Sequence, residues 1–463
     1  MQNALNNDTT NVVEITKTYL QNIAENQHLN AFIEVYSDEA LEQARLVDEK
    51  LANCSAGKLA GMVVGIKDNL CYKNHKVSAS SKILDGFESL FTATSVQRLI
   101  DEDAIIIGRL NCDEFAMGSA NENTIYGTVK NPLDNSKVAG GSSGGSAAAV
   151  SAGLCLVALG SDTGGSIRQP AAFCGIVGIK PTYSRVSRYG LIAYASSFDQ
   201  IGPLTNNVSD AALILEVIAG KDDFDSTVSK KDVDNYSTAK FDNKPKKIAY
   251  ISECLNRKGL DPEVKEFIEN KIDKLKSEGH IVEPISFPYL DLLVSTYYVL
   301  TTAEASSNLA RFDGVHYGYR SENITDLEST YINSRTEGFG EEVKRRIMLG
   351  TFVLSAGYHD AYFTKAQKIR RLIKDKTNEM FEEYDFVVSP TTPHTPFEIG
   401  KKQTDPTVMY LEDIFTVQAN LAGNPAISLP IGKHSNGLPI GLHLMADNFK
   451  EADLIAFSEY LSQ

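Results

Sequence analysis

Short apolar runs alternate with segments of helical periodicity over most of the chain. The apolar runs are typical of buried strands and occur at residues 62–66, 104–107, 154–159, 247–251, 386–388, 426–429 and 440–444. Helical periodicity is clearest at residues 12–23, 40–51, 263–276 and 342–383. The last segment is too long for one unbroken helix, so we expect a break near Gly350 or Gly357. The alternation predicts an α/β fold with a mixed β-sheet core covered by helices on both faces.

One polar stretch interrupts this pattern. Residues 221–247 are dense in Asp, Lys and Ser and lie between an expected helix at 209–219 and an expected strand at 248–251. A chain of 463 residues could form two domains by length alone, but no clear boundary divides it. We therefore interpret the stretch as a surface excursion within a single domain that spans residues 1–463.

Two loops rich in serine and glycine flank one apolar segment. The first, Gly-Gly-Ser-Ser-Gly-Gly-Ser, covers residues 140–146, and the second, Gly-Ser-Asp-Thr-Gly-Gly-Ser, covers residues 160–166. Between them, residues 147–152 have the composition of a buried helix and 154–159 that of a buried strand, which argues against a flexible linker. Glycine lets main-chain N–H groups converge beside an exposed hydroxyl, as in a nucleophile with an oxyanion site. Phosphate binding is a minor alternative, because the Gly-Lys-Ser/Thr ending of a P-loop is absent.

The base that would activate a serine does not lie in either loop. None of the eight histidines is in or beside them, although a Ser-His arrangement assembled through the fold stays open. Lys67 is the better candidate, because it stands at the end of the apolar run 62–66. A lysine can act as a base only when burial or neighbouring groups lower its pKa. The alternative for Lys67 taken by itself is a solvated surface charge.

Three separated motifs resemble the amidase signature family. They are Gly-Ile-Lys-Asp-Asn at 65–69, the first loop at 140–146, and the second loop extended through Ile-Arg-Gln-Pro-Ala-Ala to residue 172. The resemblance implies the amidase signature fold and a catalytic triad of a nucleophile, Ser166, a second serine in a cis peptide, Ser142, and Lys67. It also implies an oxyanion hole formed by four main-chain N–H groups, those of Thr163, Gly164, Gly165 and Ser166.

In this scheme Ser142 relays the proton of Ser166 to neutral Lys67 and returns it to the leaving ammonia. Ser143 and Ser146 are its near rivals, and we interpret them as hydroxyls that stabilise the loop. Asp162 and Arg168 are expected to order the loops.

The cysteines show no metal-binding pattern. Cys54, Cys71, Cys112, Cys155, Cys174 and Cys254 form neither a CxxC nor another metal-ligand spacing, so we expect reduced, mostly buried thiols and no metal. Apolar surroundings would raise the pKa of Cys155 and Cys174, which argues against a catalytic cysteine. The polar N-terminus and the absence of a long apolar run predict a cytoplasmic protein that does not contact membranes.

The charge balance constrains the partners. A formal net charge of −15 does not supply the broad cationic field that neutralises many phosphates. The chain is therefore not expected to be the main binder of a nucleic acid, and another subunit would have to hold any RNA substrate.

Segments at 303–315, 342–350 and 410–417 resemble the glutamine-hydrolysing A subunits of tRNA-dependent amidotransferases, a group within the same family. The resemblance covers nearly the whole chain. It implies that ammonia from glutamine passes to a B subunit, which uses ATP and Mg²⁺ to activate the glutamyl group of a mischarged tRNA. A small C subunit completes the heterotrimer. This chain itself would hold no cofactor.

The same resemblance implies a glutamine pocket. Arg346 would bind the α-carboxylate, Asp413 the α-ammonium, and Tyr297 would line the pocket. Charge-assisted contacts of this kind give specificity for a free amino acid. For Arg346 the alternative is a charge on a helix surface, and for Asp413 the start of a helix.

Two other functions remain as alternatives. A stand-alone amidase of the family would lack the clamp of Arg346 and Asp413 and prefer apolar amides. A non-enzymatic scaffold is disfavoured, because Lys67, Ser142 and Ser166 are all present. The sequence does not distinguish a glutaminyl from an asparaginyl tRNA product.

Overall fold

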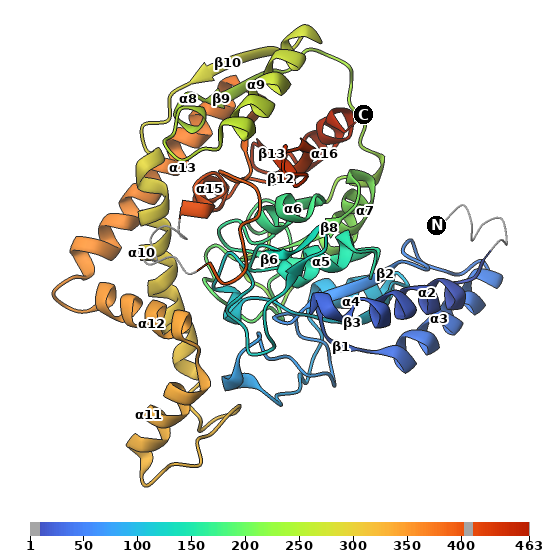
Figure 1. Cartoon of the computed structure of the whole chain (residues 1–463), viewed down its shortest axis with the longest axis vertical. Coiled ribbons are helices and arrows are strands. Elements are labelled where there is room, and N and C mark those ends of the chain that lie inside the picture. The colour runs from blue at the N-terminus through green and yellow to red at the C-terminus, as the bar shows by residue number, and fades with distance from the viewer. Residues whose placement is uncertain (1–9, 402–410, 463) are drawn as a thin grey trace.

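The computed structural model describes residues 10–401 and 411–462 (Figure 1). Within these ranges eleven strands form one mixed sheet in the order β1-β3-β2-β6-β8-β7-β12-β13-β11-β9-β10, and β4 and β5 form a separate small sheet. The strands are β1 (Phe32–Val35), β2 (Val63–Lys67), β3 (Ile105–Leu110), β4 (Lys130–Asn131), β5 (Asp134–Val138), β6 (Val157–Asp162), β7 (Val177–Lys180), β8 (Gln200–Thr205), β9 (Lys247–Ile251), β10 (Ile281–Ile285), β11 (Phe386–Pro390), β12 (Ala426–Lys433) and β13 (Pro439–Ala446).

Helices connect most of these strands. The α-helices are α2 (Val12–Glu25), α3 (Ser37–Ala52), α4 (Thr94–Asp101), α5 (Gly144–Ser151), α6 (Arg168–Cys174), α7 (Val208–Ile218), α8 (Ser252–Leu255), α9 (Pro262–Ser277), α10 (Leu290–Asn308), α11 (Leu327–Gly338), α12 (Glu341–Leu354), α13 (Lys365–Glu383), α15 (Val417–Ala422) and α16 (Glu451–Leu461). Shorter turns are η1 (Gln27–Leu29), η2 (Lys82–Leu84), η3 (Glu114–Ala116), η4 (Tyr236–Thr238), η5 (Leu309–Arg311), η6 (Asp360–Thr364) and η7 (Leu411–Asp413).

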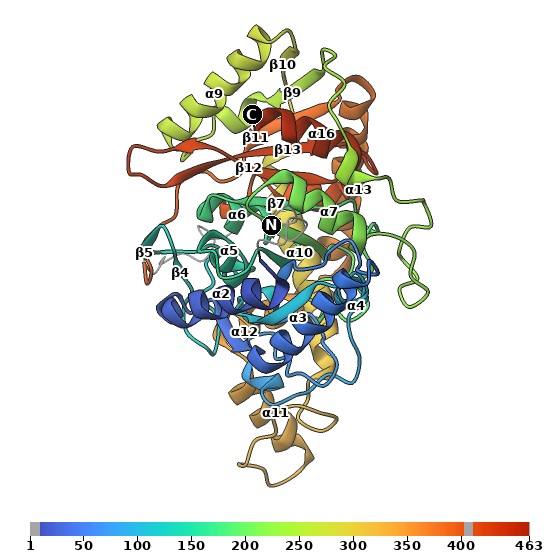
Figure 2. The ribbon, with the colours of Figure 1, turned by 90° about the vertical axis from the view of Figure 1, so that its right-hand side faces the viewer.

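Helices cover both faces of the sheet, because alternate strand residues point to opposite sides. In β11, Phe386 and Val388 belong to an apolar core that includes residues of α4, α7, α9 and α16. Val387, between them, belongs to a second core built with α10, α12, α13 and α15. A third core joins α2, α3, α5 and α6 to β2, β3 and β6. The expected fold class, a mixed α/β sheet with helices on both faces, is therefore confirmed (Figure 2).

The expected strands agree with the structure except in their limits. The runs at 62–66, 104–107, 247–251, 386–388, 426–429 and 440–444 fall largely in β2, β3, β9, β11, β12 and β13. The run at 154–159 is shifted, because β6 begins at Val157 and continues to Asp162 in register with β8. Its last two residues, Ser161 and Asp162, are polar, so the apolar pattern ends before the strand does.

The long helical segment at 342–383 is broken, as expected. Helix α12 ends at Leu354 and α13 begins at Lys365, with Gly357 in the break. Gly350, the other position considered for this break, lies inside α12. A Cβ on Gly350 would lie 1.9 Å from the carbonyl oxygen of Thr302. This glycine therefore lets α12 pack closely against α10.

The polar stretch at 221–247 connects α7 to β9 and contains η4. Tyr236 of η4 is 1% exposed, and its hydroxyl accepts a hydrogen bond of 2.6 Å from Nε of the buried Arg185. This contact thus packs the polar stretch against the rest of the protein.

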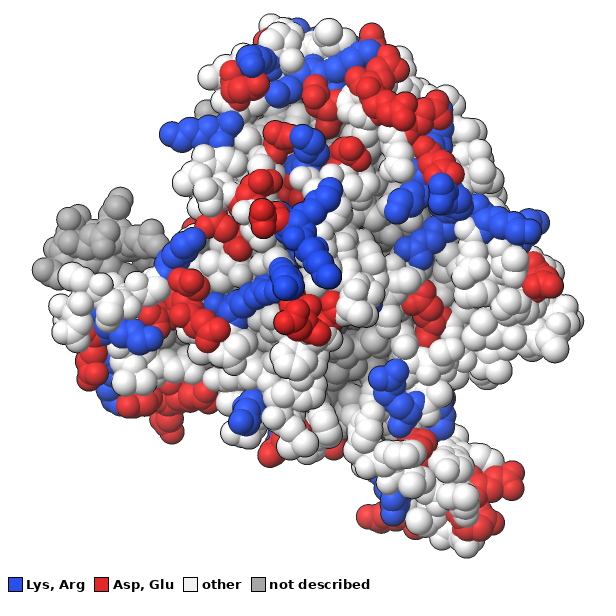
Figure 3. Space-filling view, turned by 180° about the vertical axis from the view of Figure 1, so that it is seen from behind, with Lys and Arg blue, Asp and Glu red and all other residues white. Residues whose placement is uncertain are grey.

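Charges of both signs are present on the surface. On the face shown in Figure 3, Lys and Arg side chains are interspersed with Asp and Glu side chains. This face does not offer the continuous cationic surface that follows a phosphate backbone. Across residues 10–401 and 411–462, none of the helices has the length and apolar character needed to cross a lipid bilayer.

Candidate active site

The sheet topology brings the three serine- and lysine-bearing motifs together. Strands β2 and β6 are adjacent and parallel, with Ile66 opposite Leu159, so their carboxyl ends lie at the same edge of the sheet. Lys67 is the last residue of β2, and the loop that carries Ser166 follows β6. Ser142 lies just before α5, which packs against both strands.

Small residues let α5 approach the sheet this closely. The helix is buried from Gly144 to Val150, as its composition predicted. A Cβ on Gly145 would lie 2.3 Å from the carbonyl oxygen of Asn111, so a larger residue would force α5 outward. The start of α5 is therefore held closely against the chain that follows β3.

Lys67 lies in a cluster of hydroxyl groups. Its Nζ atom is 2.7 Å from Oγ of Ser142, 2.9 Å from Oγ of Ser143 and 3.0 Å from Oγ of Ser161. The side chain is fully buried and these three partners are neutral. Burial outweighs the carboxylates further away and lowers the pKa of Lys67 to about 8. The alternative of a solvated surface charge is therefore wrong.

Ser142 and Ser166 come from the two loops, which are joined through the main chain. The N–H of Ser143 donates to the carbonyl of Ser166 at 3.1 Å, and the Gly141–Ser142 peptide is cis. Ser142 is completely buried, whereas Ser166 is 8% exposed. In the described part of the chain no hydrogen bond joins the hydroxyls of Ser142 and Ser166. Lys67 thus contacts Ser142 directly, and Ser166 is the more accessible of the two serines.

The rival serines of the first loop behave differently from each other. Ser146 donates its hydroxyl to the carbonyl of Leu159 at 3.1 Å and holds α5 on β6, as expected. Ser143 donates to the carbonyl of Ser161 at 3.2 Å, but it also contacts Lys67. Ser143 therefore both stabilises the loop and belongs to the hydroxyl cluster.

Four consecutive N–H groups of the second loop have no acceptor. Within residues 10–401 and 411–462, none of the main-chain N–H groups of Thr163, Gly164, Gly165 and Ser166 donates a hydrogen bond, although all four residues are buried. Gly165 has a φ of +147°, a conformation that favours glycine. Buried N–H groups without partners are rare, so four in succession form a place where the oxygen of a ligand can accept.

A buried ion pair orders this loop. Asp162 and Arg168 are both 0% exposed and are joined by contacts of 2.9 and 3.1 Å. Burial alone would raise the pKa of Asp162, but the guanidinium of Arg168 holds it below its usual value. Asp162 also accepts from the N–H of Ile167 at 3.1 Å. These contacts agree with the structural role expected for the pair.

Two of the predicted substrate residues, Tyr297 of α10 and Asp413 of η7, lie close to the second loop. A Cβ on Gly164 would lie 2.6 Å from the hydroxyl oxygen of Tyr297, and one on Gly165 would lie 3.4 Å from Oδ1 of Asp413. Asp413 accepts long hydrogen bonds from Ser119 at 3.4 Å and from Tyr298 at 3.5 Å. Asp413 as a whole residue is 7% exposed.

Arg346 reaches this region from α12. Its guanidinium lies 5.6 Å from the ring centre of Tyr194 and 5.2 Å from that of Tyr298. It donates to Glu342 at 2.8 Å and to the hydroxyl of Tyr194 at 2.9 Å, and it is 4% exposed. The alternative of a charge on the helix surface is therefore wrong for Arg346.

The electrostatics of Asp413 reflect this enclosure. Burial raises its pKa to about 7, and the positive charge of Arg346 opposes the shift without cancelling it. The acid therefore stands close to its ionisation midpoint at neutral pH, and a cation bound beside it would favour the carboxylate.

Several contributing residues carry no local signal in the sequence. Ser161 contacts Lys67 from the end of β6. Asp199 accepts from the hydroxyl of Thr163 at 2.6 Å and from the N–H of Tyr194 at 3.0 Å, so it links the second loop to the tyrosine that contacts Arg346. Burial raises the pKa of Asp199 to about 7. The fold, and not a sequence motif, brings these residues close to the loop that carries Ser166.

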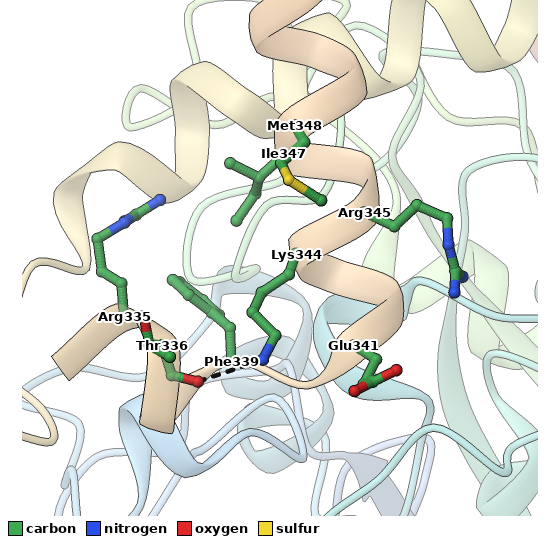
Figure 4. A pocket seen from close by; sticks show the side chains of 8 residues that line it. All are labelled: Arg335, Thr336, Phe339, Glu341, Lys344, Arg345, Ile347 and Met348. Carbon is green, nitrogen blue, oxygen red and sulfur yellow. Dashed lines mark hydrogen bonds between the residues drawn. The ribbon is translucent and has the colours of Figure 1, made fainter. Parts of the chain in front are cut away.

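A separate hollow lies between α11 and α12 (Figure 4). It has a volume of about 430 Å³ and is lined by Phe339, Ile347 and Met348 together with Arg335 and Lys344. Arg345 lies at this hollow, although its neighbour Arg346 is buried in the candidate site. The two neighbouring arginines therefore lie on different sides of α12.

The thiols and acids offer no metal site. No three His, Cys, Asp or Glu residues in the described ranges are grouped so that they could hold a metal ion. All six cysteines lie within those ranges and are free thiols, and only Cys54 is exposed. Burial raises the pKa of Cys155 to about 12, which disfavours its reactive thiolate.

Comparisons with known proteins agree with this geometry. The amidase family model matches residues 14–455. The A subunit of the glutamyl-tRNA(Gln) amidotransferase of Chlorobium limicola is 51% identical over 457 residues, which cover 97% of this chain and 95% of that protein. The protein of the same name from Chlorobaculum tepidum is 52% identical over 450 residues, covering 97% and 94%.

Solved structures show the same architecture. The crystal structure of the A subunit of the glutamyl-tRNA(Gln) amidotransferase of Thermotoga maritima is 41% identical, with a TM-score of 0.80 over 96% of this chain and 90% of that one. The peptide amidase of Stenotrophomonas maltophilia is 29% identical, with a TM-score of 0.84 over 100% and 95% of the two chains.

Proposed function

The chain belongs to the amidase family, and on this premise we propose that it hydrolyses glutamine as the A subunit of a glutamyl-tRNA(Gln) amidotransferase. The observation that carries the chemistry is the contact of 2.7 Å between the buried Lys67 and Ser142, beside four N–H groups without acceptors. The two relatives above 50% identity, both A subunits by name, supply the reaction class.

Ser166 is the proposed nucleophile. It would attack the side-chain amide of glutamine and form a glutamyl ester, while the N–H groups of Thr163, Gly164, Gly165 and Ser166 stabilise the negative oxygen of the tetrahedral intermediate. Water would then hydrolyse the ester and release glutamate. The proton of Ser166 would pass to Ser142 and on to Lys67, and the same route would return it to the departing ammonia.

The hydrogen bonds around Lys67 are compatible with this direction of proton transfer. The only proton of the Ser143 hydroxyl is used on the carbonyl of Ser161, so Ser143 can only accept from Lys67. A neutral lysine has two N–H donors and one lone pair. When Lys67 donates to both Ser143 and Ser161, its lone pair is left for the hydroxyl of Ser142, the nearest of the three at 2.7 Å. Lys67 is then placed to receive a proton from Ser142.

Arg346 and Asp413 are proposed to bind the charged ends of glutamine, the α-carboxylate and the α-ammonium, with Tyr297 lining the pocket. Two buried side chains of opposite charge, of which Asp413 lies beside the second loop, match an amino acid better than an apolar amide. This favours glutamine over the substrates of a stand-alone amidase, which is the alternative function.

The partners follow from the proposed reaction. Ammonia would pass to a B subunit that holds the mischarged tRNA and uses ATP and Mg²⁺, with a small C subunit completing a cytoplasmic heterotrimer. This chain would contribute no cofactor. Glu-tRNA(Gln) is the proposed acceptor, and Asp-tRNA(Asn) is a second candidate. A net charge of −15 agrees with the tRNA being held mainly by another subunit.

A Ser166→Ala variant in the reconstituted complex tests the proposal. Transamidation with glutamine should be lost and transamidation with free ammonia retained, because only the ammonia source is removed. Ser151→Ala is the matched control: its hydroxyl donates to the carbonyl of Cys174 at 2.8 Å on the far end of α5. Loss of both activities in a folded Ser166→Ala complex would contradict the assignment, and hydrolysis of simple amides but not glutamine by the wild type would favour the alternative.

A further inference from the structure

One residue outside all three motifs holds the carbonyl of Gly164. Oγ1 of Thr416 donates to this carbonyl oxygen at 2.6 Å. Thr416 is fully buried, and no other donor in the described ranges reaches the same oxygen. The hydroxyl is also 3.1 Å from the carbonyl of Asp413, but its single proton is directed to the nearer acceptor.

Thr416 is itself fixed from two sides. Its N–H donates to the carbonyl of Asp413 at 3.0 Å. Its own carbonyl accepts from Nη1 of Arg168 at 2.9 Å, and Arg168 is held by the buried Asp162. A Cβ on Gly165 would lie 2.3 Å from Oγ1 of Thr416, so the threonine is packed directly against the glycine.

The carbonyl of Gly164 and the N–H of Gly165 belong to one planar trans peptide and point in opposite directions. An anchor on the carbonyl oxygen therefore also sets the direction of the N–H. Glycine on both sides of this peptide leaves few steric barriers to its rotation. The hydrogen bond from Thr416 is thus the contact that keeps the N–H of Gly165 turned away from Thr416.

We propose that Thr416 is a positioning residue that orients the N–H of Gly165 toward the oxyanion of the substrate. This inference rests on the proposed function and on the role proposed there for the N–H of Gly165.

The test compares Thr416→Val with Thr416→Ser in the reconstituted complex. Valine keeps the shape but removes the hydroxyl, so kcat for glutamine should fall by about 10²–10³, the usual cost of losing one oxyanion donor, while KM changes less than about threefold. Serine keeps the hydroxyl and should restore kcat to within about tenfold of wild type. Hydrolysis of a simple amide should fall equally in Thr416→Val, because every amide passes through the same oxyanion.

Thr16→Val is the matched control for the loss of a buried threonine hydroxyl. Thr16 is also 0% exposed and donates to the carbonyl of Val12 at 2.8 Å, in α2. This variant should lose a comparable amount of thermal stability and keep its kcat.

The inference is overturned if Thr416→Val keeps kcat within tenfold of wild type. It is also overturned if Thr416→Val and Thr416→Ser lose activity equally, or if their losses follow their thermal stability. If the wild type hydrolyses another amide but not glutamine, the proposed function fails, and the same comparison on that amide still decides the role of Thr416. A folded wild type that hydrolyses neither would overturn both.

Discussion

Nζ of Lys67 lies 2.7 Å from Oγ of Ser142, a residue 75 positions further along the chain. The contact is made inside the protein, where burial lowers the pKa of the lysine to about 8. A base that is partly neutral near physiological pH is therefore in direct contact with the proposed proton relay.

The first prediction concerns this base. Lys67→Arg keeps a positive charge but cannot supply a neutral amine, so glutamine hydrolysis should fall by about 10²–10⁴. Lys374→Arg, on the exposed surface of α13, is the control and should leave the rate unchanged. Steady-state release of glutamate measures both. A folded Lys67→Arg protein with wild-type turnover would remove Lys67 from the mechanism.

The second prediction concerns pH. Both the neutral form of Lys67 and the ionised form of Asp413 increase as the pH rises, through about 8 and about 7 respectively. The rate on a simple amide depends on Lys67 alone, whereas kcat/KM for glutamine also needs the carboxylate of Asp413. The ratio of the two kcat/KM values should therefore level off above pH 7 and fall about tenfold per pH unit well below it. A ratio that does not change between pH 5.5 and 8.5 would exclude an ionising clamp at Asp413.

The third prediction concerns the α-carboxylate of glutamine. Arg346→Ala should lower kcat/KM for glutamine, because a buried charge-assisted contact is lost. The loss should correspond to about 2–5 kcal/mol of transition-state stabilisation. Slow hydrolysis of a simple amide should be almost unchanged.

Arg345→Ala is the matched control, because Arg345 also pairs with Glu342 but is 46% exposed. It should affect neither substrate. Equal losses on both substrates in Arg346→Ala would mean that Arg346 supports the fold or the triad and that the glutamine pocket lies elsewhere.

The fourth prediction concerns stability. Arg168→Ala leaves the carboxylate of Asp162 buried and unpaired, so the free energy of unfolding should fall by about 3–5 kcal/mol. The control is Arg371→Ala, which breaks a pair with Asp375 whose side chains are 76% and 49% exposed, and should cost less than about 1 kcal/mol. Denaturant unfolding of the two variants gives the comparison. Similar small losses would show that the Asp162–Arg168 pair is not needed to order the second loop.

Much of the site could be predicted because its residues lie in short, chemically distinctive segments. Lys67 follows an apolar strand, and Ser142 and Ser166 stand among glycines, so each is marked by its immediate neighbours. The strands β9 and β11 were predicted for the same reason, since an apolar run reports burial without reference to the rest of the chain. Only a resemblance that extends beyond the loops marks Arg346 and Asp413 as candidates.

Residues with ordinary neighbours could not be recognised in this way. Asp199 and Thr416 become important only because the fold places them against Thr163 and Gly164. The sequence also could not choose between Gly350 and Gly357 for the break in the long helix, and only the structure shows that the missing Cβ of Gly350 allows two helices to touch.

The sequence by itself indicated the longer apolar strands and several helices, and its motifs marked the residues that we propose as nucleophile, relay and base. Tertiary structure alone decided that β2 and β6 lie side by side and parallel, so that Lys67 meets the hydroxyls of Ser142 and Ser161. The physical reason is that the pairing of strands and the surroundings that lower the pKa of Lys67 depend on contacts between residues distant in the chain. Local patterns of hydrophobicity do not encode such contacts.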